Sequence, residues 1–522
     1  MRKWIVFLFV IVFPISLKAE DKPRLVVGIT VSQFYPEWLA LYGHDLSEGG
    51  FKRLAGQGRE VKADYEYMYS QTGVDHATIY SGMSPSEHGI VAHEWYDRLR
   101  GRRVSNVLDG DTRLIGEEEE GEGMSPRRMQ ALTLGCVMRM NNSFSKVYSI
   151  GVNEEEAVLS GGSCANLALW LSDKTGKWIS SNFYADSLPG WLREHNGKLE
   201  ADQFIRRGWM PVSAETENLT AMKLKSKVGL NNGFYYDLVQ AKRKYDTYKI
   251  LKATPYVNTM VVDLAGEVLK NEQLGRDNDA DLLALNFSCL DYMNRDYGIY
   301  SREFQDVVVR LDRDIERLLA MLDERVGKGN YTVFLTFSEA RELLPEDLQK
   351  VRLETGYFSI FKAVALTKSF LSVLYGEGDW ILDYDASQIY LDRGLLEKKK
   401  IPVQQMQDKV ADFLIEFEGI SRVVTAHALT HNTFAAGEGI LFQHAFSQKR
   451  SGDILYSLQP MWVSQLKDKE DNYARYSKRN RVPLYLYGVG SGALLPADCP
   501  MVSLLPALCR LLGLPEPYFL DR

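Results

Sequence analysis

The chain has 522 residues, of which 45% are hydrophobic and 25% are charged, with a formal net charge of −7. This composition is typical of a large globular protein with ample material for an apolar core. The negative charge argues against a basic nucleic-acid-binding surface and against a polybasic patch that binds membranes. We therefore expect no nucleic-acid partner.

The amino terminus resembles a secretory signal peptide. The basic start Met1-Arg-Lys is followed by an apolar run from Trp4 to Ile15 and by Ser16-Leu-Lys-Ala19. This order predicts a signal peptide over residues 1–19, cleavage after Ala19, and export to the periplasm or the medium. The alternative is an uncleaved membrane anchor, for which the run is short, since a span needs about 20 apolar residues. No later stretch is long and apolar enough, so we expect no integral membrane span.

Short runs of apolar residues further along the chain predict buried parallel strands at 24–31, 281–288 and 331–336. Between the last two runs, apolar residues recur with helical spacing over 303–326. Strands that alternate with helices indicate an α/β fold, with a mostly parallel central sheet covered by helices on both faces. Further patterns predict a strand at 483–487 and a closing helix at 502–514.

Two regions interrupt this alternation, at about 171–256 and 342–458, and we interpret both as cap insertions in an α/β domain that spans 20–522. The second has its own strand and helix signals, at 388–391 and 403–417. The five cysteines are Cys136, Cys164, Cys289, Cys499 and Cys509. The odd number leaves at least one unpaired within the chain, and one disulfide is possible. Their spacing makes no case for a metal site.

One segment indicates a particular chemistry. It is Tyr69-Ser-Gln-Thr-Gly-Val-Asp-His-Ala-Thr-Ile-Tyr-Ser-Gly82. It looks like the nucleophile segment of a two-metal phosphoryl-transfer enzyme, with Thr72 as the attacking group. A hydroxyl is a poor nucleophile until a metal or a base activates it, so such a site needs Asp and His ligands elsewhere in the chain.

Several further phrases accompany this segment in a recognisable order, and they run over nearly the whole chain. They include His88-Gly-Ile-Val91, Trp95-Tyr-Asp97, Met124-Ser-Pro-Arg127 and Arg310-Leu-Asp-Arg-Asp314. Together they resemble the alkaline-phosphatase superfamily, and most closely its PafA-type phosphomonoesterases, relatives of type I phosphodiesterases and nucleotide pyrophosphatases. The resemblance implies an alkaline-phosphatase-like fold that binds two zinc ions.

The resemblance also places the family's active site on particular residues. The nucleophile falls on Thr72, the phosphate-binding Asn on His93, and a basic pair that clamps the phosphoryl oxygens on Asn153 and Glu155. The metal-ligand positions fall on Ser32, Asp291, Arg295, Ser338, Glu339 and Asn472. Only Thr72 and Asp291 keep the family's residue types.

These replacements oppose phosphoryl transfer. Serine is a weak neutral ligand for divalent cations, and arginine offers only hydrogen-bond donors. Glu155 would repel a phosphate where the family has positive charge. Arg295, four residues after Asp291, could instead pair with Asp291 and Glu339 and take the place of the metals. Without metal, we expect Thr72 to be a loop residue that hydrogen-bonds locally.

Two functions remain open. The first is an exported pseudoenzyme without cofactor that binds a protein, a polymer or a small ligand. The alternative is a divergent phosphomonoesterase or phosphodiesterase that uses zinc held by Thr72, Asp291, Glu339 and His93. Two groups of histidines are compatible with metal binding, but a structural role explains each group better. They are His76, His88 and His93, and the pair His427 and His431.

Overall fold

The computed structural model describes residues 22–33, 38–117, 121–212, 234–293, 297, 301–339, 345–349, 352–465, 473–474 and 480–516. The predicted signal peptide at 1–19 lies outside these residues, as do Arg295 and Asn472. Among the described helices, none combines the length and the apolar character needed to cross a membrane.

Within the described residues, one large sheet organises the molecule. In spatial order its strands are β20 (Asp498–Pro500), β2 (Arg59–Asp64), β19 (Arg481–Gly488), β11 (Tyr331–Ser338), β1 (Leu25–Ser32), β10 (Asp281–Phe287), β7 (Val147–Gly151), β8 (Leu167–Leu171), β9 (Trp178–Ser181), β5 (Leu108–Ile115) and β6 (Glu122–Met124). The five central strands, from β11 to β8, run parallel, and β19 and β9 flank them antiparallel. The predicted mostly parallel sheet is confirmed.

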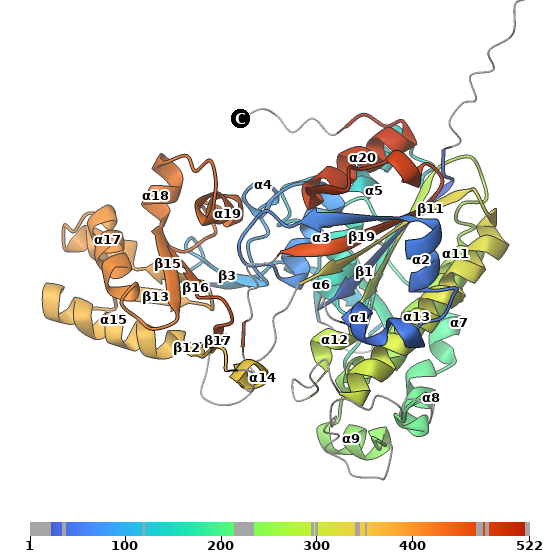
Figure 1. Ribbon diagram of the computed structural model, residues 1–522, viewed down its shortest axis with the longest axis horizontal. Helices are drawn as coiled ribbons and strands as arrows, with labels where there is room; N and C mark the ends of the chain where they lie inside the picture. Colours follow the sequence, from blue (N-terminus) through green and yellow to red (C-terminus); the bar gives the residue numbers. More distant parts are fainter. Residues whose placement is uncertain are drawn as a thin grey trace, which may run out of the picture.

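Helices cover both faces of this sheet (Figure 1). One face carries α2 (Phe51–Gln57), α11 (Tyr256–Asn271) and α13 (Arg302–Leu322). The other carries α3 (Thr72–Ser81), α6 (Glu154–Gly161) and α20 (Leu504–Leu512). Because both faces are covered, every residue of β1, β10 and β11 is buried, which explains their uninterrupted apolar runs.

The region 342–458 builds a second apolar core of its own. Its sheet has the antiparallel order β13 (Ile381–Tyr384), β14 (Gln388–Leu391), β16 (Ile454–Leu458) and β15 (Ile420–Thr425). The helices α15 (Ile360–Tyr375) and α17 (Val403–Leu414) pack beside it. In Figure 1 this subdomain, in orange, stands apart from the α/β body. Additional small sheets are thus inserted into the main fold.

The hairpin of β3 (Glu94–Asp97) and β4 (Arg102–Ser105) joins this subdomain to the body. Arg98, at its turn, donates to the fully buried carboxylate of Asp453 at 3.0 Å. The region 171–256 behaves differently. It contributes β9 to the large sheet, and its helices α7 (Gly190–Gly197) and α8 (Glu200–Arg207) bury side chains in the main core. The exact boundaries of both insertions stay a prediction.

One disulfide joins Cys136 on α5 (Leu134–Asn141) to Cys164, which precedes β8. Cys289, Cys499 and Cys509 are free and buried. The possible disulfide of the sequence analysis is therefore present, and it lies in the α/β body.

Candidate functional site

Thr72 is the first residue of α3, at the carboxyl edge of the large sheet. Its hydroxyl donates to Asp291 Oδ2 at 3.3 Å. Asp291 lies on the short helix α12 (Cys289–Tyr292), directly after β10. The expectation of a loop residue with a local hydrogen bond is wrong, because Thr72 begins a helix and its partner is 219 residues away. The fold thus brings together the two positions that keep the family's residue types.

Ser32 and Ser338 end the neighbouring strands β1 and β11, where they are partners in the sheet register. Both are buried, with 2% and 0% of their surface exposed. Neither hydroxyl has a hydrogen-bond partner among the described residues. A buried, unpaired hydroxyl is costly. The predicted ligand positions are therefore adjacent in space, but they offer two neutral hydroxyls instead of carboxylates.

The residues after these strands, Gln33 and Glu339, adopt left-handed backbone conformations, with φ of 59° and 50°. Gln33 N–H donates to the carbonyl of Ser338 at 2.9 Å, which ties the two strand ends together. Gln33 Nε2 donates to Asp291 Oδ1 at 2.5 Å. The Asp291 carboxylate is thus engaged by two side chains, Thr72 on one oxygen and Gln33 on the other.

Asp75 is a fully buried carboxyl beneath this edge, one turn into α3. It accepts hydrogen bonds from the hydroxyls of Tyr67 at 2.6 Å and Ser70 at 2.5 Å, and from Glu339 N–H at 2.8 Å. Burial raises the pKa of Asp75 to about 7, against the lowering effect of these bonds. Asp75 therefore fixes the backbone of Glu339 at its left-handed turn.

Glu155 lies over the first turn of α3. A Cβ added to Gly73 would lie 1.8 Å from Glu155 Oε1, so the carboxylate rests directly on the helix beside Thr72. Glu155 Oε2 pairs with His93 Nδ1 at 2.8 Å, and Asn106 Nδ2 donates to Oε1. The neighbouring His93 and Asn106 hold the pKa of Glu155 below its ordinary value despite burial. Glu155 in turn raises the pKa of His93 to about 9.

The replaced clamp position Asn153 has a structural role. Its side-chain oxygen accepts from Glu156 N–H at 3.1 Å and so caps the amino terminus of α6. Its Nδ2 donates to Glu156 Oε1 at 2.7 Å, and Ser288 donates to the other oxygen at 2.9 Å. Burial and the nearby Asp291 raise the pKa of Glu156 to about 8. In place of a basic pair, this side of the site presents an amide and buried carboxyls.

His76 and His88 belong to the framework, as predicted. His76 contacts the carbonyl of Thr72 at 2.6 Å and Asn286 Oδ1 at 2.9 Å. His88 contacts the Thr78 hydroxyl at 3.1 Å, and burial lowers its pKa to about 3. His93 differs, because 63% of its side chain is exposed and it faces Glu155. His427 and His431 stack on each other with ring centroids 4.0 Å apart.

A comparison with protein families matches residues 26–337 to the type I phosphodiesterase / nucleotide pyrophosphatase family. The chain belongs to this family. The matched residues run from β1, through the Thr72 segment and β10, to the end of β11. They therefore include the strand ends and the helix start that form the candidate site. The predicted membership of the alkaline-phosphatase superfamily is confirmed.

Individual family members support this assignment. The alkaline phosphatase PafA of Elizabethkingia meningoseptica is 27% identical over 94% of this chain and 92% of its own. A protein of Myroides odoratus named a calcium-transporting ATPase is 30% identical over 86% of this chain and 83% of its own. The crystal structure of PafA superposes with a TM-score of 0.87 at 26% identity, covering 95% of this chain and 96% of PafA.

The residues at this edge do not fit the pair of zinc ions that the family resemblance implies. Ser32 and Ser338 are uncharged, and Asp291 is bound by Thr72 and Gln33. Among the described residues, no three His, Cys, Asp or Glu side chains converge as a metal site would require. Arg295 and Asn472 lie outside those residues, so the predicted replacement of the metals by Arg295 stays a prediction.

Sequence reasoning missed three residues of this edge: Gln33, Asp75 and Asn106. Gln33 directly follows a predicted ligand position, and Asp75 lies inside the Thr72 segment, so both could have been considered. Asn106 carries no local signal, because its partner Glu155 is 49 residues away. Gln33 and Asn106 each donate a hydrogen bond to a carboxylate of this edge, and Asp75 accepts one from the backbone N–H of Glu339.

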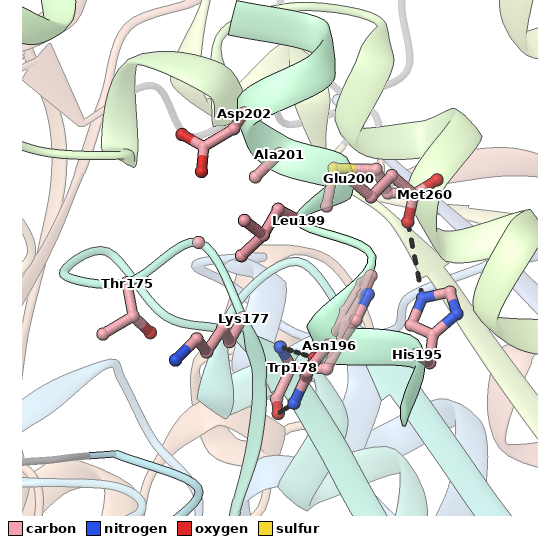
Figure 2. A pocket seen from close by; sticks show the side chains of 11 residues that line it. Thr175, Lys177, Trp178, His195, Asn196, Leu199, Glu200, Ala201, Asp202 and Met260 are labelled. Atoms are coloured by element: carbon pink, nitrogen blue, oxygen red, sulfur yellow. Dashed lines mark hydrogen bonds and ion pairs between the residues drawn. The ribbon is translucent and has the colours of Figure 1, made fainter. Parts of the chain in front are cut away.

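A polar pocket lies away from this edge, between β9 and the helices α7, α8 and α11 (Figure 2). His195 and Glu200 face each other in it, with Nε2 and Oε2 3.4 Å apart. Burial raises the pKa of Glu200 to about 7. None of the residues named by the family resemblance lines this pocket. We interpret the pair as an internal contact between α7 and α8.

Proposed function

We propose that this family member is an exported pseudoenzyme, which keeps the alkaline-phosphatase-like fold and has lost phosphoryl transfer. One observation carries the proposal. The Glu155 carboxylate rests on Gly73, beside the Thr72 hydroxyl, where the family resemblance implies positive charge. Ser32 and Ser338 supply hydroxyls where the resemblance implies metal-binding carboxylates.

The electrostatics of the reaction explain why Glu155 matters. Phosphoryl transfer is accelerated mainly by metal ions and basic side chains that stabilise negative charge on the transferred group. A carboxylate in contact with the first turn of α3 would instead repel the phosphoryl group and raise its energy. The exposed imidazolium of His93 offsets one charge, but it is already paired with Glu155 at 2.8 Å.

The proposal also covers where the protein is located and what it binds. Residues 1–19 have the pattern of a signal peptide, and the Cys136–Cys164 disulfide supports an oxidising compartment. We propose export to the periplasm or the medium, without bound zinc, and the binding of a protein, a polymer or a small ligand. Amino-terminal sequencing of the mature protein should begin at Glu20, whereas a chain that begins at Met1 in the membrane fraction would contradict export.

The alternative function is a metal-dependent phosphomonoesterase or phosphodiesterase with Thr72 as its nucleophile. The comparisons favour it, because relatives that cover more than nine-tenths of this chain are named alkaline phosphatases. It would require a zinc ion held by Thr72, Asp291, Glu339 and His93. In its favour, Thr72 and Asp291 lie within hydrogen-bond distance.

One experiment separates the two functions. Zinc content of the purified protein is measured together with hydrolysis of an aryl phosphate, with and without added zinc. Thr72→Ala serves as the matched control. We expect substoichiometric zinc and no hydrolysis beyond that of Thr72→Ala, because the ligands and the basic clamp are missing. About two zinc ions per chain, with hydrolysis that Thr72→Ala abolishes, would establish the enzyme instead.

A further inference from the structure

The inserted subdomain has an uncovered apolar surface on α15. Leu366, Val373 and Leu374 are 54%, 85% and 49% exposed, although large apolar side chains usually avoid water. The opposite side of the same helix is buried in the subdomain's own core. A helix that is apolar around most of its circumference is normally covered on all sides. The exposed side of α15 therefore lacks a cover in the described structure.

These side chains form one continuous strip. Residues three, four, seven or eight positions apart on a helix lie on one face, so Leu366, Phe370, Val373 and Leu374 are neighbours. Phe370 stacks on Phe413 of α17, with ring centroids 4.4 Å apart and planes 4° apart. Both rings are only partly buried. The stacked pair marks the seam between α15 and α17, and the strip runs along one side of it.

An acidic row runs along the other side of the seam. Asp408, Asp412 and Glu416 recur every fourth residue on or just after α17, and all three are exposed. Asp412 precedes Phe413, and Glu416 is one turn beyond it. Lys409 lies among them, and the exposed Lys362 of α15 lies one turn before Leu366, so the three carboxylates outnumber these two lysines and an excess of one negative charge remains. We name the strip, the Phe370–Phe413 seam and this row together the α15–α17 face.

We propose that the α15–α17 face is a docking surface for a basic amphipathic helix of a partner protein. The apolar side of such a helix would cover Leu366, Val373 and Leu374, and its Lys or Arg side chains would face Asp412 and Glu416. Amphipathic helices bind apolar grooves in this way, and charge complementarity sets their orientation. The face lies on the outer rim of the subdomain, accessible from solvent (Figure 1).

The charge of the row selects this occupant over two others. An anionic membrane surface would be repelled by Asp408, Asp412 and Glu416. A second copy of the chain would bring a second row of the same sign to the interface. A basic helix satisfies both the apolar strip and the acidic row. The inference is independent of catalysis, because it concerns a surface remote from Thr72 and is tested by binding alone.

The test uses a fluorescein-labelled peptide of leucine and lysine, designed as an amphipathic helix, with the full-length mature protein. Fluorescence anisotropy should show binding that weakens as salt increases. Val373→Asp and Leu366→Asp should each weaken binding at least tenfold. Phe144→Asp is the matched control, because Phe144 is also exposed, on the α/β body, and its replacement should leave binding unchanged.

A charge exchange makes the test specific. The double variant Asp412→Lys/Glu416→Lys should lose the lysine peptide and gain a peptide in which glutamate replaces lysine. Circular dichroism of each variant shows that the fold is kept. The proposal is overturned if wild-type protein does not bind the lysine peptide, or if Val373→Asp and the charge exchange leave binding unchanged. It is also overturned if the protein forms a dimer that Val373→Asp dissociates, since the face then binds a second copy.

Discussion

The carboxyl edge of the large sheet and the outer face of the inserted subdomain differ in how far their side chains are satisfied by contacts within the chain. At the sheet edge, Asp291, Asp75 and Glu155 each receive hydrogen bonds from within the chain. On the α15–α17 face, apolar side chains such as Val373 remain uncovered. In the first region these carboxylates already have hydrogen-bond partners. In the second, covering the exposed apolar side chains would be favourable in free energy.

This contrast suggests where binding energy is available. A ligand that binds the carboxylates of the sheet edge must displace hydrogen bonds that they already accept, and each displaced bond reduces the net gain. Among the described residues of this edge, the buried hydroxyls of Ser32 and Ser338 have no such partner to displace. A helix on the α15–α17 face removes apolar surface from water at about 25 cal/mol per Å². Under the proposed function, the α/β body would serve as a scaffold and the insertion would supply the binding surface. Four predictions test whether the two regions are stabilised independently and whether the polar groups of the sheet edge are paired as described.

The largest effect should come from Asp453, where the β3–β4 hairpin of the α/β body contacts the inserted subdomain. Its carboxylate is fully buried and accepts from Arg98 at 3.0 Å and from Arg393 at 2.7 Å. Asp453→Ala leaves the buried donors Leu391 N–H and Gln407 Nε2 without their acceptor, which costs about 1–3 kcal/mol for each. Urea unfolding should show the loss in the inserted subdomain first. Asp64→Ala, which removes an exposed pair with Arg481, should cost less than about 1 kcal/mol. Equal losses in the two variants would contradict this account.

The second effect concerns the Cys136–Cys164 disulfide, which is confined to the α/β body. It links residues 28 positions apart in the sequence, and breaking it should destabilise the body by about 2–4 kcal/mol. Unfolding with and without reductant measures the loss. The double variant Cys136→Ala/Cys164→Ala should no longer respond to reductant. Peptide binding at the α15–α17 face should persist under reducing conditions, and its loss would show that the two regions are not separable.

The third effect is a dependence of stability on pH. Burial raises the pKa of Asp75 to about 7 and that of Glu156 to about 8. An acid with a raised pKa binds more protons in the folded state, so stability should fall as pH rises from about 4 to 7 or 8. Each group contributes at most about 1.4 kcal/mol per pH unit. Asp75→Asn should flatten the slope below pH 7, whereas the exposed control Asp111→Asn should not.

The smallest effect belongs to His93 and Glu155. Glu155 raises the pKa of His93 to about 9, so the pair's contribution is complete below about pH 6.5 and is lost as pH rises through about 9. Because His93 is largely exposed, His93→Ala should cost less than about 1 kcal/mol. In NMR titration, Glu155→Gln should bring the pKa of His93 back towards 6.5. An unchanged His93 pKa in that variant would show that the pair does not form in solution.

The fold was largely predictable because its central strands are buried on both faces. Uninterrupted apolar runs predicted 24–31, 281–288 and 331–336, and the structure has β1, β10 and β11 at 25–32, 281–287 and 331–338. Helical spacing predicted 303–326, where α13 spans Arg302–Leu322. The α15–α17 face escaped prediction, because apolar residues on a helix resemble core residues until the packing of the subdomain is known.

The candidate site was predictable only in part. The family resemblance assigned Ser32, Ser338, Thr72 and Asp291 to one site. The structure adds that Ser32 and Ser338 end neighbouring strands and that Thr72 hydrogen-bonds to Asp291. The resemblance could not supply Gln33 as a partner of Asp291, because the two residues are 258 positions apart. Contacts of this kind depend on the order of strands in the sheet, which local sequence patterns do not encode.

The contact of Glu155 with Gly73 also constrains how this chain can evolve. A methyl group at position 73 would lie 1.8 Å from Glu155 Oε1, so Gly73→Ala forces the carboxylate and its partners to move. The same substitution becomes tolerable once Glu155 is shortened to alanine, which makes the two positions epistatic. A basic residue restored at position 155 alone would lie beside His93, whose carboxylate partner would then be lost. Under the proposed loss of phosphoryl transfer, a change at position 155 alone should not create a phosphate-binding site, because Ser32 and Ser338 stay uncharged.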